Sequence, residues 1–352
     1  MQPSWPKGSQ PDPAEAAAAA DLLACRNLIR GGSRTFFAAS LLLPRRVAEP
    51  AFALYAFCRV ADDAIDESDD PAASLDGLRL RLAAIAQGRP QDSPVDRAFA
   101  TVLADHAIPV QIPESLLEGF SWDATGRRYT TLSQLNEYAV RVAGTVGVMM
   151  ALLMGRRERE VLACACDLGV AMQLTNIARD VGDDARLGRL YLPADWMREA
   201  GIDPDAWLAR PAFSPALAGV VDRLLATAEP LYARAAAGIG WLPAACRPGM
   251  HAARLIYAQI GESLRRQGLD SVTRRAVVSG WEKSVLLGAA VAATCRSAES
   301  LEGEGVDEGR FLVESVPADA VSPLAGSKVV WLIDLFERLE RQQLERQSLP
   351  GR

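Results

Sequence analysis

The stretch Phe52–Glu67, FALYAFCRVADDAIDE, has the pattern of a helix with two different faces. Apolar residues suited to packing recur every three or four positions, namely Leu54, Cys58, Ala61 and Ile65. A second face carries an aromatic ring, a cation and two carboxylates at the same spacing, namely Tyr55, Arg59, Asp62 and Asp66. Side chains spaced in this way rise from one side of a helix. A lone carboxylate pair is more often a solvated face than a metal site, but this pair lies in an otherwise apolar helix.

A second polar face follows in Val170–Asp184, VAMQLTNIARDVGDD. Its members are separated by three, four and four residues, namely Gln173, Asn176, Asp180 and Asp184. The apolar residues between them predict that most of this helix is buried, and buried charges need partners or metals. A purely structural interpretation pairs Arg179 with Asp183, four residues later. That interpretation leaves Asp180 and Asp184 without partners.

The two polar faces together predict a metal site. If the two helices face each other, one cleft is lined by five oxygen-bearing side chains, namely Asp62, Asp66, Asn176, Asp180 and Asp184. Such a cluster repels itself unless cations fill it. Oxygen ligands without Cys or His favour Mg²⁺, with Mn²⁺ as the alternative, and Mg²⁺ usually bridges carboxylates to phosphates. No GxxxxGK or GxGxxG loop for a nucleotide is present, so an apolar helical cavity favours a prenyl diphosphate as the ligand.

The composition fits one large globular domain. The chain has 352 residues, of which 49% are hydrophobic and 23% charged, and its net charge is −6. This acidic balance argues against nucleic acid as a partner, because such binding is built largely from Lys and Arg. The presence of only two histidines argues against a histidine-rich zinc site or a Ser-His-Asp triad. The six cysteines contain no CxxC pair and indicate reduced core residues.

The organisation along the chain is that of an all-α protein. Helical spacing of apolar residues runs from Asp21 almost to Gln343, without a convincing alternating strand. We expect a disordered N-terminal tail over residues 1–20 and one all-helical domain over residues 21–300. Residues 301–352 should form a C-terminal segment with a terminal helix that packs on the domain.

Neither a signal peptide nor a membrane-spanning segment is predicted. The first twenty residues lack the basic start and the continuous apolar core of a signal peptide. The longest uncharged stretch, Val142–Gly155, is shorter than the roughly 20 apolar residues that a membrane span needs. We therefore expect a cytoplasmic protein, and peripheral contact with the inner membrane stays open.

Several segments resemble a known family. They are GSRTFF at 32–37, YAFCRVADDAID at 55–66, EYAVRVAGTVG at 137–147 and MQLTNIARDVGDDARLGRLYLPADW at 172–196, with weaker similarity in ARLIYAQIG at 253–261 and SVTRRAVVSGWEK at 271–283. These segments are similar to the squalene and phytoene synthase family, closest to its bacterial phytoene synthases. The likeness covers about residues 22–290, and paired acidic motifs in this context are highly specific.

The resemblance implies a fold and a set of roles. The fold would be a single-domain helical bundle of the isoprenoid synthase type around a central apolar cavity. The metal ligands would be the five oxygen-bearing residues of the two polar faces. Substrate contacts would come from Ser33, Thr35, Arg59, Tyr138, Gln173, Arg179 and Tyr257. Among these, the resemblance gives Tyr138, Arg59 and Arg179 catalytic roles beside the diphosphates, although Tyr138 is equally well interpreted as a core aromatic.

The resemblance also implies a reaction. Two molecules of geranylgeranyl diphosphate would condense head to head through a cyclopropyl diphosphate to phytoene, without a nicotinamide cofactor. The nearest alternative is a squalene or dehydrosqualene synthase that uses farnesyl diphosphate, with NADPH in the squalene case. A chain-elongating prenyl synthase is a further alternative, because residues 62–66 read DDAID and so match DDxxD. A family member without catalysis, serving as a helical assembly factor, should have eroded acidic motifs, whereas both motifs are intact here.

Two departures from the family pattern and two glycines bear on the expected site. Asp183 stands where Glu is usual, which keeps the charge. Trp122-Asp123 stands where a smaller or more flexible residue commonly precedes the Asp, which leaves the cavity shape open. Gly144 and Gly147 would each cost about 1 kcal/mol relative to Ala within a helix. We expect them to allow close approach of the backbone to substrate or to a neighbouring helix.

Overall fold

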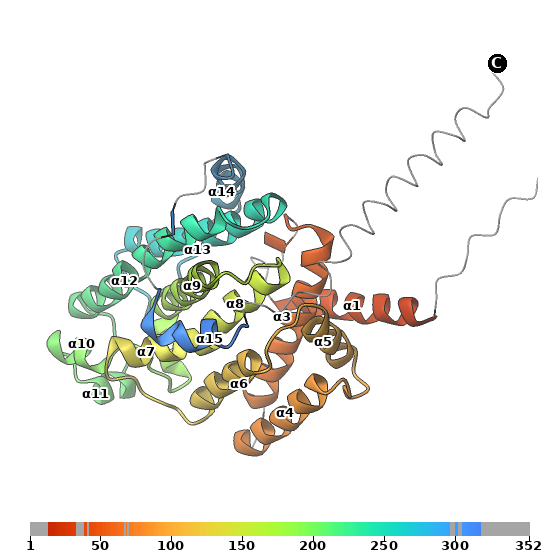
Figure 1. The fold of residues 1–352 in the computed structure, drawn as a ribbon. Coiled ribbons are helices and arrows are strands. Elements are labelled where there is room, and N and C mark those ends of the chain that lie inside the picture. Colours follow the sequence, from red (N-terminus) through yellow and green to blue (C-terminus); the bar gives the residue numbers. More distant parts are fainter. Residues whose placement is uncertain are drawn as a thin grey trace, which may run out of the picture.

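A computed structural model describes residues 13–317, apart from 33–38, 41, 67, 69, 296–299 and 302–304. Every regular element among the described residues is helical (Figure 1). The predicted contact residues Ser33 and Thr35, and the predicted terminal helix, lie outside the described residues. Asp66 ends a described helix, but its side chain is not among the described parts. The all-α fold class is confirmed.

The α-helices, in chain order, are α1 (Pro13–Gly32), α3 (Arg45–Asp66), α4 (Pro71–Ala86), α5 (Pro94–Asp105), α6 (Gln111–Ala124), α7 (Leu132–Ala139), α8 (Thr145–Leu153), α9 (Arg159–Arg186), α10 (Ala194–Glu199), α11 (Pro204–Ala209), α12 (Pro215–Ile239), α13 (Arg247–Arg266), α14 (Gly280–Ala293) and α15 (Arg310–Glu314). A π-helical turn, Val140–Gly144, joins α7 to α8. Short 3₁₀ turns occupy Ala244–Cys246 and Asp307–Gly309.

The helix α9 forms the centre of the molecule. It packs against α8, α12 and α13, and the short α15 lies against it as well (Figure 1). By length and composition α9 is the one helix in the described part that could cross a membrane, yet 78% of its most apolar window is buried inside the protein. Its neighbours therefore account for its apolar character, as expected of a core helix. The six cysteines are all free, and four of them are buried.

The N-terminal helix begins earlier than the sequence analysis expected. Residues 13–20, assigned there to a disordered tail, form the first turns of α1. A proline is well tolerated in the first turn of a helix, and alanine, which fills most of this stretch, has the highest helix propensity. The second half of α1 packs on α3 and α5, which supplies the burial that an isolated helix lacks.

Glycines allow α9 and its neighbour to approach closely. A Cβ atom on Gly147 would lie 2.0 Å from the backbone oxygen of Ala165, and one on Gly169 would lie 2.2 Å from that of Ala143. A Cβ atom on Gly144 would lie 2.7 Å from the Cys166 sulfur. We expected Gly144 and Gly147 to approach either substrate or a neighbouring helix, and both approach the neighbouring helix α9.

Replacing Gly147 with alanine should therefore push two helices apart. We expect Gly147→Ala to lower the free energy of unfolding by about 1–3 kcal/mol, the usual cost of overpacking a core. The matched control is Gly219→Ala in α12, where an added Cβ meets nothing within 4 Å and a gain of about 0.5–1 kcal/mol is expected from helix propensity. Urea denaturation of both variants measures the difference. Equal stability changes in the two variants would contradict this packing account.

Candidate active site

An apolar cavity of about 290 Å³ lies between α3, α8, α9 and α13. Its walls include Leu54, Met150 and Met172, and the predicted contact residues Gln173 and Tyr257 also line it. The close approach described above shapes one wall, because Gly147 and Gly169 both face the cavity. The helical bundle therefore has the central apolar cavity that the sequence analysis expected.

Both acidic motifs lie at the same end of this cavity. Cys58 of α3 lines it, and Asp62 follows one helical turn later; Asn176 of α9 lines it, and Asp180 follows one turn later. Tyr257 lies between the two sides: besides burial, the charge of Asp180 raises the pKa of Tyr257, and besides burial, the charge of Asp62 raises the pKa of the neighbouring Tyr55. The two polar faces thus converge, as the metal-site hypothesis requires.

Asp180 is held by two arginines. Its carboxylate accepts hydrogen bonds from Arg179 Nε at 2.8 Å and from Arg275 Nε at 2.8 Å. Burial raises the pKa of Asp180, but the two guanidinium groups outweigh it and lower the pKa below its usual value. The backbone of Asp180 is also non-helical, with φ −105° and ψ 15°, so α9 bends at this residue.

These contacts correct the structural interpretation considered from the sequence. Arg179 pairs with the adjacent Asp180 rather than with Asp183. Asp183 instead pairs with Arg186 and, at 3.7 Å, with Arg275. Helical spacing favoured the pairing of Arg179 with Asp183, because spacing relates only residues of the same helix. The second partner of Asp180, Arg275, comes from a segment 95 residues further along the chain.

Gly182 is the residue that allows Arg275 to reach Asp180. A Cβ atom on Gly182 would lie 2.3 Å from the backbone oxygen of Val272, and the Gly182 N–H donates to the backbone oxygen of Ser271 at 2.9 Å. The segment before Arg275 therefore rests directly on α9. The glycine inside DVGDD and the arginine pair inside SVTRRAVV were both quoted from the sequence, but nothing in their spacing connects them.

Asp184 has an unusual environment. Burial and the nearby charges of Asp180 and Asp123 raise the pKa of Asp184 to about 7, although Arg189 acts in the opposite direction. Its ionised form is therefore disfavoured in the metal-free protein near neutral pH. A cation close to Asp184 would remove that penalty.

Tyr138 joins the second acidic motif through Asp123, at the end of α6. Tyr138 and Tyr191 donate their hydroxyl protons to the two oxygens of Asp123, each at 2.7 Å. The two rings stack with centroids 5.2 Å apart. Burial raises the pKa of Tyr138 well above its ordinary value, so the hydroxyl stays protonated. Tyr138 is thus a buried aromatic that also belongs to the charge network around Asp184.

Asp123 is a site residue that the sequence analysis treated only as a departure from the family pattern. The preceding Trp122 is packed under two guanidinium groups, with Arg127 3.6 Å and Arg141 4.5 Å from the ring centroid. This cation–π arrangement fixes the end of α6 and with it the carboxylate of Asp123. No spacing rule would have linked Asp123 to Tyr138, which lies on another helix.

The first acidic motif is partly offset by an arginine of its own helix. Arg59 lies 2.8 Å from Asp63 and 4.0 Å from Asp62, and all three side chains are partly exposed. Arg59 therefore stands at the open end of α3, where a charged ligand can reach it. The sequence analysis assigned Arg59 to substrate, and nothing in the described structure tests that role.

The described residues do not form a ready-made five-ligand cluster. No group of three or more His, Cys, Asp or Glu side chains among them is close enough to hold one ion, because Asp180 is turned to its arginines. Two observations nevertheless fit a cation. The Oδ1 atom of Asn176 is buried without a hydrogen-bond partner, and Asp184 carries a disfavoured negative charge. Amide and carboxylate oxygens are ligands that Mg²⁺ accepts.

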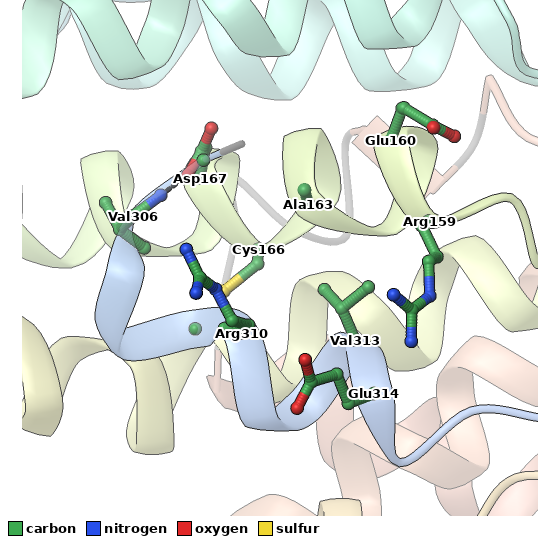
Figure 2. Close-up of a pocket in the computed structure, with 11 residues that line it drawn as sticks. Arg159, Glu160, Ala163, Cys166, Asp167, Val306, Arg310, Val313 and Glu314 are labelled. Atoms are coloured by element: carbon green, nitrogen blue, oxygen red, sulfur yellow. Dashed lines mark hydrogen bonds between the residues drawn. The ribbon is translucent and has the colours of Figure 1, made fainter. Parts of the chain in front are cut away.

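A second cavity, of about 470 Å³, lies on a different face of α9 (Figure 2). It is lined by side chains of both charges, among them Arg159, Arg310 and Glu314. Asp167 in its wall is held by Arg234 at 2.6 Å and by the backbone N–H of Val306 at 3.0 Å. This cavity contains no residue of either acidic motif, and it marks the junction between α9 and the C-terminal segment.

Comparisons with known proteins agree with this geometry. The profile of the squalene/phytoene synthase family matches residues 29–282. A phytoene synthase from Cereibacter sphaeroides is 49% identical over 352 residues, covering 95% of this chain and 98% of the relative. One from Rhodobacter capsulatus is 52% identical over 284 residues, covering 80% and 84%. The crystal structure of a dehydrosqualene synthase in complex with ligand has a TM-score of 0.72 at 32% identity, covering 80% of this chain and 98% of that chain.

An apolar cavity that ends at two acidic helices within a helical bundle defines a prenyltransferase of the isoprenoid synthase type. The chain belongs to the squalene/phytoene synthase family. The family resemblance and the fold expected from it are thereby confirmed. The family uses a divalent metal, and the donor set of α9 fits that requirement.

The raised pKa of Asp184 predicts a pH-dependent affinity for the metal. A proton and a cation compete for this carboxylate, so the affinity should fall as the pH drops below about 7, by up to about tenfold per pH unit. Calorimetric titration with Mg²⁺ and an unreactive prenyl diphosphate at several pH values measures this. In Asp184→Asn the overall affinity should be weaker and this part of the pH dependence lost. An identical pH profile in the two proteins would contradict the assignment.

Proposed function

We propose that this chain condenses two molecules of geranylgeranyl diphosphate head to head to phytoene, by way of a cyclopropyl diphosphate. The observation that carries the proposal is the pair of acidic helices at one end of an apolar cavity. Identity of 49% to a phytoene synthase, over nearly the whole of both chains, supports the substrate and the product. Phytoene formation belongs to carotenoid biosynthesis.

The metal would be Mg²⁺, with Mn²⁺ as a substitute, held by Asp62 and Asp66 on α3 and by Asn176, Asp180 and Asp184 on α9. When bound, the metal neutralises diphosphate and makes it a better leaving group. Arg179 and Arg275 already lie beside Asp180. If Asp180 turned to a bound metal, these guanidinium groups would be available to phosphate oxygens, for which their planar geometry is suited. Ser33, Thr35 and Arg59 remain the proposed contacts to the diphosphates.

The apolar walls protect the reaction from water. Loss of diphosphate breaks an allylic C–O bond and leaves a cation that water would quench. The cavity lining is mainly apolar, with Leu54 and Val146 among its residues, and so it keeps water away from such a cation. Attack by the double bond of the second molecule and loss of a proton give the cyclopropyl diphosphate. A second ionisation, rearrangement and loss of another proton then give the C40 product.

The electron balance argues against a nicotinamide cofactor. Two diphosphates and two protons leave, and no hydride enters, so phytoene forms without a reductant. Formation of squalene from farnesyl diphosphate would need one. The structural similarity to a dehydrosqualene synthase keeps the shorter substrate as the competing candidate, and that reaction also needs no reductant.

Product analysis decides between the substrates. We expect purified protein with Mg²⁺ to convert geranylgeranyl diphosphate into a C40 hydrocarbon, at a rate that NADPH leaves unchanged. Mass spectrometry of the extracted hydrocarbons, with farnesyl diphosphate in a parallel reaction, measures this. A C30 hydrocarbon as the main product of a competition between the two substrates would contradict the proposal.

Substitution of the proposed ligands tests the metal assignment. We expect Asp62→Asn and Asp180→Asn to lower kcat by at least about 100-fold, because each removes a charged ligand and metal sites are sensitive to such losses. The control is Asp76→Asn on α4, a surface carboxylate outside the site. Circular dichroism should show the same helix content in all three variants. Turnover of Asp62→Asn or Asp180→Asn at the rate of Asp76→Asn would refute the assignment.

A further inference from the structure

The helix α14 lies at the edge of the molecule and leaves an apolar face uncovered. It packs on the outer side of α13 and projects beyond it in Figure 1. Trp281 is 78% exposed, Val285 53% and Val291 52%, whereas Ala290 is its buried residue. Val277, just before the helix, is 67% exposed and extends the same surface. Trp281 has the highest exposed fraction among the large hydrophobic side chains in the described part of the chain.

The exposed side of α14 carries no charged residue. Its members are Trp281, Ser284, Val285, Gly288, Ala289, Val291 and Ala292. These residues and Val277 are called the α14 face below. Surface helices normally turn charged residues to solvent, and an exposed apolar patch of this kind marks an interaction site. The two charges of α14 lie in its first turn, where Glu282 is engaged by Ser279 and Arg266.

The border of the α14 face is basic. Residues 271–295 contain Arg274, Arg275 and Lys283 but only one acidic residue, Glu282, in a chain whose net charge is −6. Arg274 is mostly exposed, and Lys283 follows Trp281 by two positions. Tryptophan is enriched at the interface between lipid and water, and basic residues beside an apolar face attract anionic headgroups. An exposed apolar surface with basic residues at its border therefore fits the surface of an anionic bilayer better than the surface of a second acidic protein.

The α14 face adjoins the active site. A hollow of about 160 Å³ is lined by Val277 and Lys283 on one side and by Arg179 and Arg275 on the other. These two arginines are the partners of Asp180. The helix α13 separates the α14 face from the apolar cavity, which it lines through Met250, Ala253 and Tyr257. Only one helix therefore lies between the α14 face and the cavity.

We propose that the α14 face docks on an anionic lipid bilayer and brings the apolar cavity, which lies one helix away, close to the membrane surface. The choice of a bilayer as the occupant rests in part on the proposed function, because both the substrate and the product of that reaction are lipids. Docking would allow the prenyl chains to enter from the membrane and the hydrocarbon to leave into it without crossing water.

Vesicle binding by the full-length protein, without substrate or metal, tests the proposal. One set of vesicles is phosphatidylcholine alone, and the other contains about 30% phosphatidylglycerol. We expect binding to the anionic vesicles, weakened at least about tenfold by Trp281→Ser combined with Val285→Asp. The matched control is Leu80→Asp on α4, where an equally exposed apolar residue, 74% exposed, receives the same charge away from the α14 face. Quenching by brominated lipids should be reduced in Trp281→Phe.

The outcomes separate this proposal from the proposed function. Circular dichroism and turnover with detergent-dispersed substrate should be the same in the Trp281→Ser, Val285→Asp variant and in the wild type. Failure of the wild type to bind anionic vesicles, or equal weakening by Leu80→Asp, would overturn the proposal even if phytoene is formed. A dimer that Val285→Asp dissociates, or cross-links from α14 to residues 318–352, would assign the α14 face to protein contacts and also overturn it. Vesicle binding with the expected pattern would support it even if no phytoene forms.

Discussion

The carboxylates of α9 must stay close together beside an apolar cavity, and their mutual repulsion is the constraint that organises this end of the molecule. At Asp180 the repulsion is offset by two guanidinium groups, Arg179 from its own helix and Arg275 from a distant segment. At Asp184 the repulsion is only partly offset, and the pKa of Asp184 is therefore raised to about 7. In the metal-free site the arginines offset the charge of Asp180 but leave Asp184 in a net repulsive environment, which a cation would relieve.

That network is positioned by close contacts between backbones, which glycines allow. Gly182 lets the segment before Arg275 rest on α9, whereas Gly147 and Gly169 bring α8 and the π-helical turn against the same helix about four to five turns earlier. The cavity and the charges are thus both built on α9. A change that shifts α9 should alter the cavity and the charge network together, which links the packing of the core to the chemistry of its open end.

Helical spacing was sufficient to predict the all-α fold, whereas the central apolar cavity was expected from the family resemblance. Helical spacing indicates which side chains share one face of one helix, and the structure places Asp62 and Asp180 one turn beyond the cavity-lining residues Cys58 and Asn176. Spacing could not give the contacts between distant segments. The partnership of Asp180 with Arg275, and that of Asp123 with Tyr138 and Tyr191, depend on how helices and loops pack. The proposed set of five metal ligands stays a prediction, and in the structure Asp180 is held by Arg179 and Arg275.

The most direct test of the central claim is a crystal structure with Mn²⁺ and an unreactive analogue of geranylgeranyl diphosphate, with the metal located by its anomalous signal. The account predicts Mn²⁺ between α3 and α9, on the carboxylates of both polar faces, with the prenyl chain in the apolar cavity and Asp180 turned from Arg275 to the metal. A diphosphate bound without metal at these helices, or an analogue seated in the cavity beside Arg159 and Glu314, would contradict it.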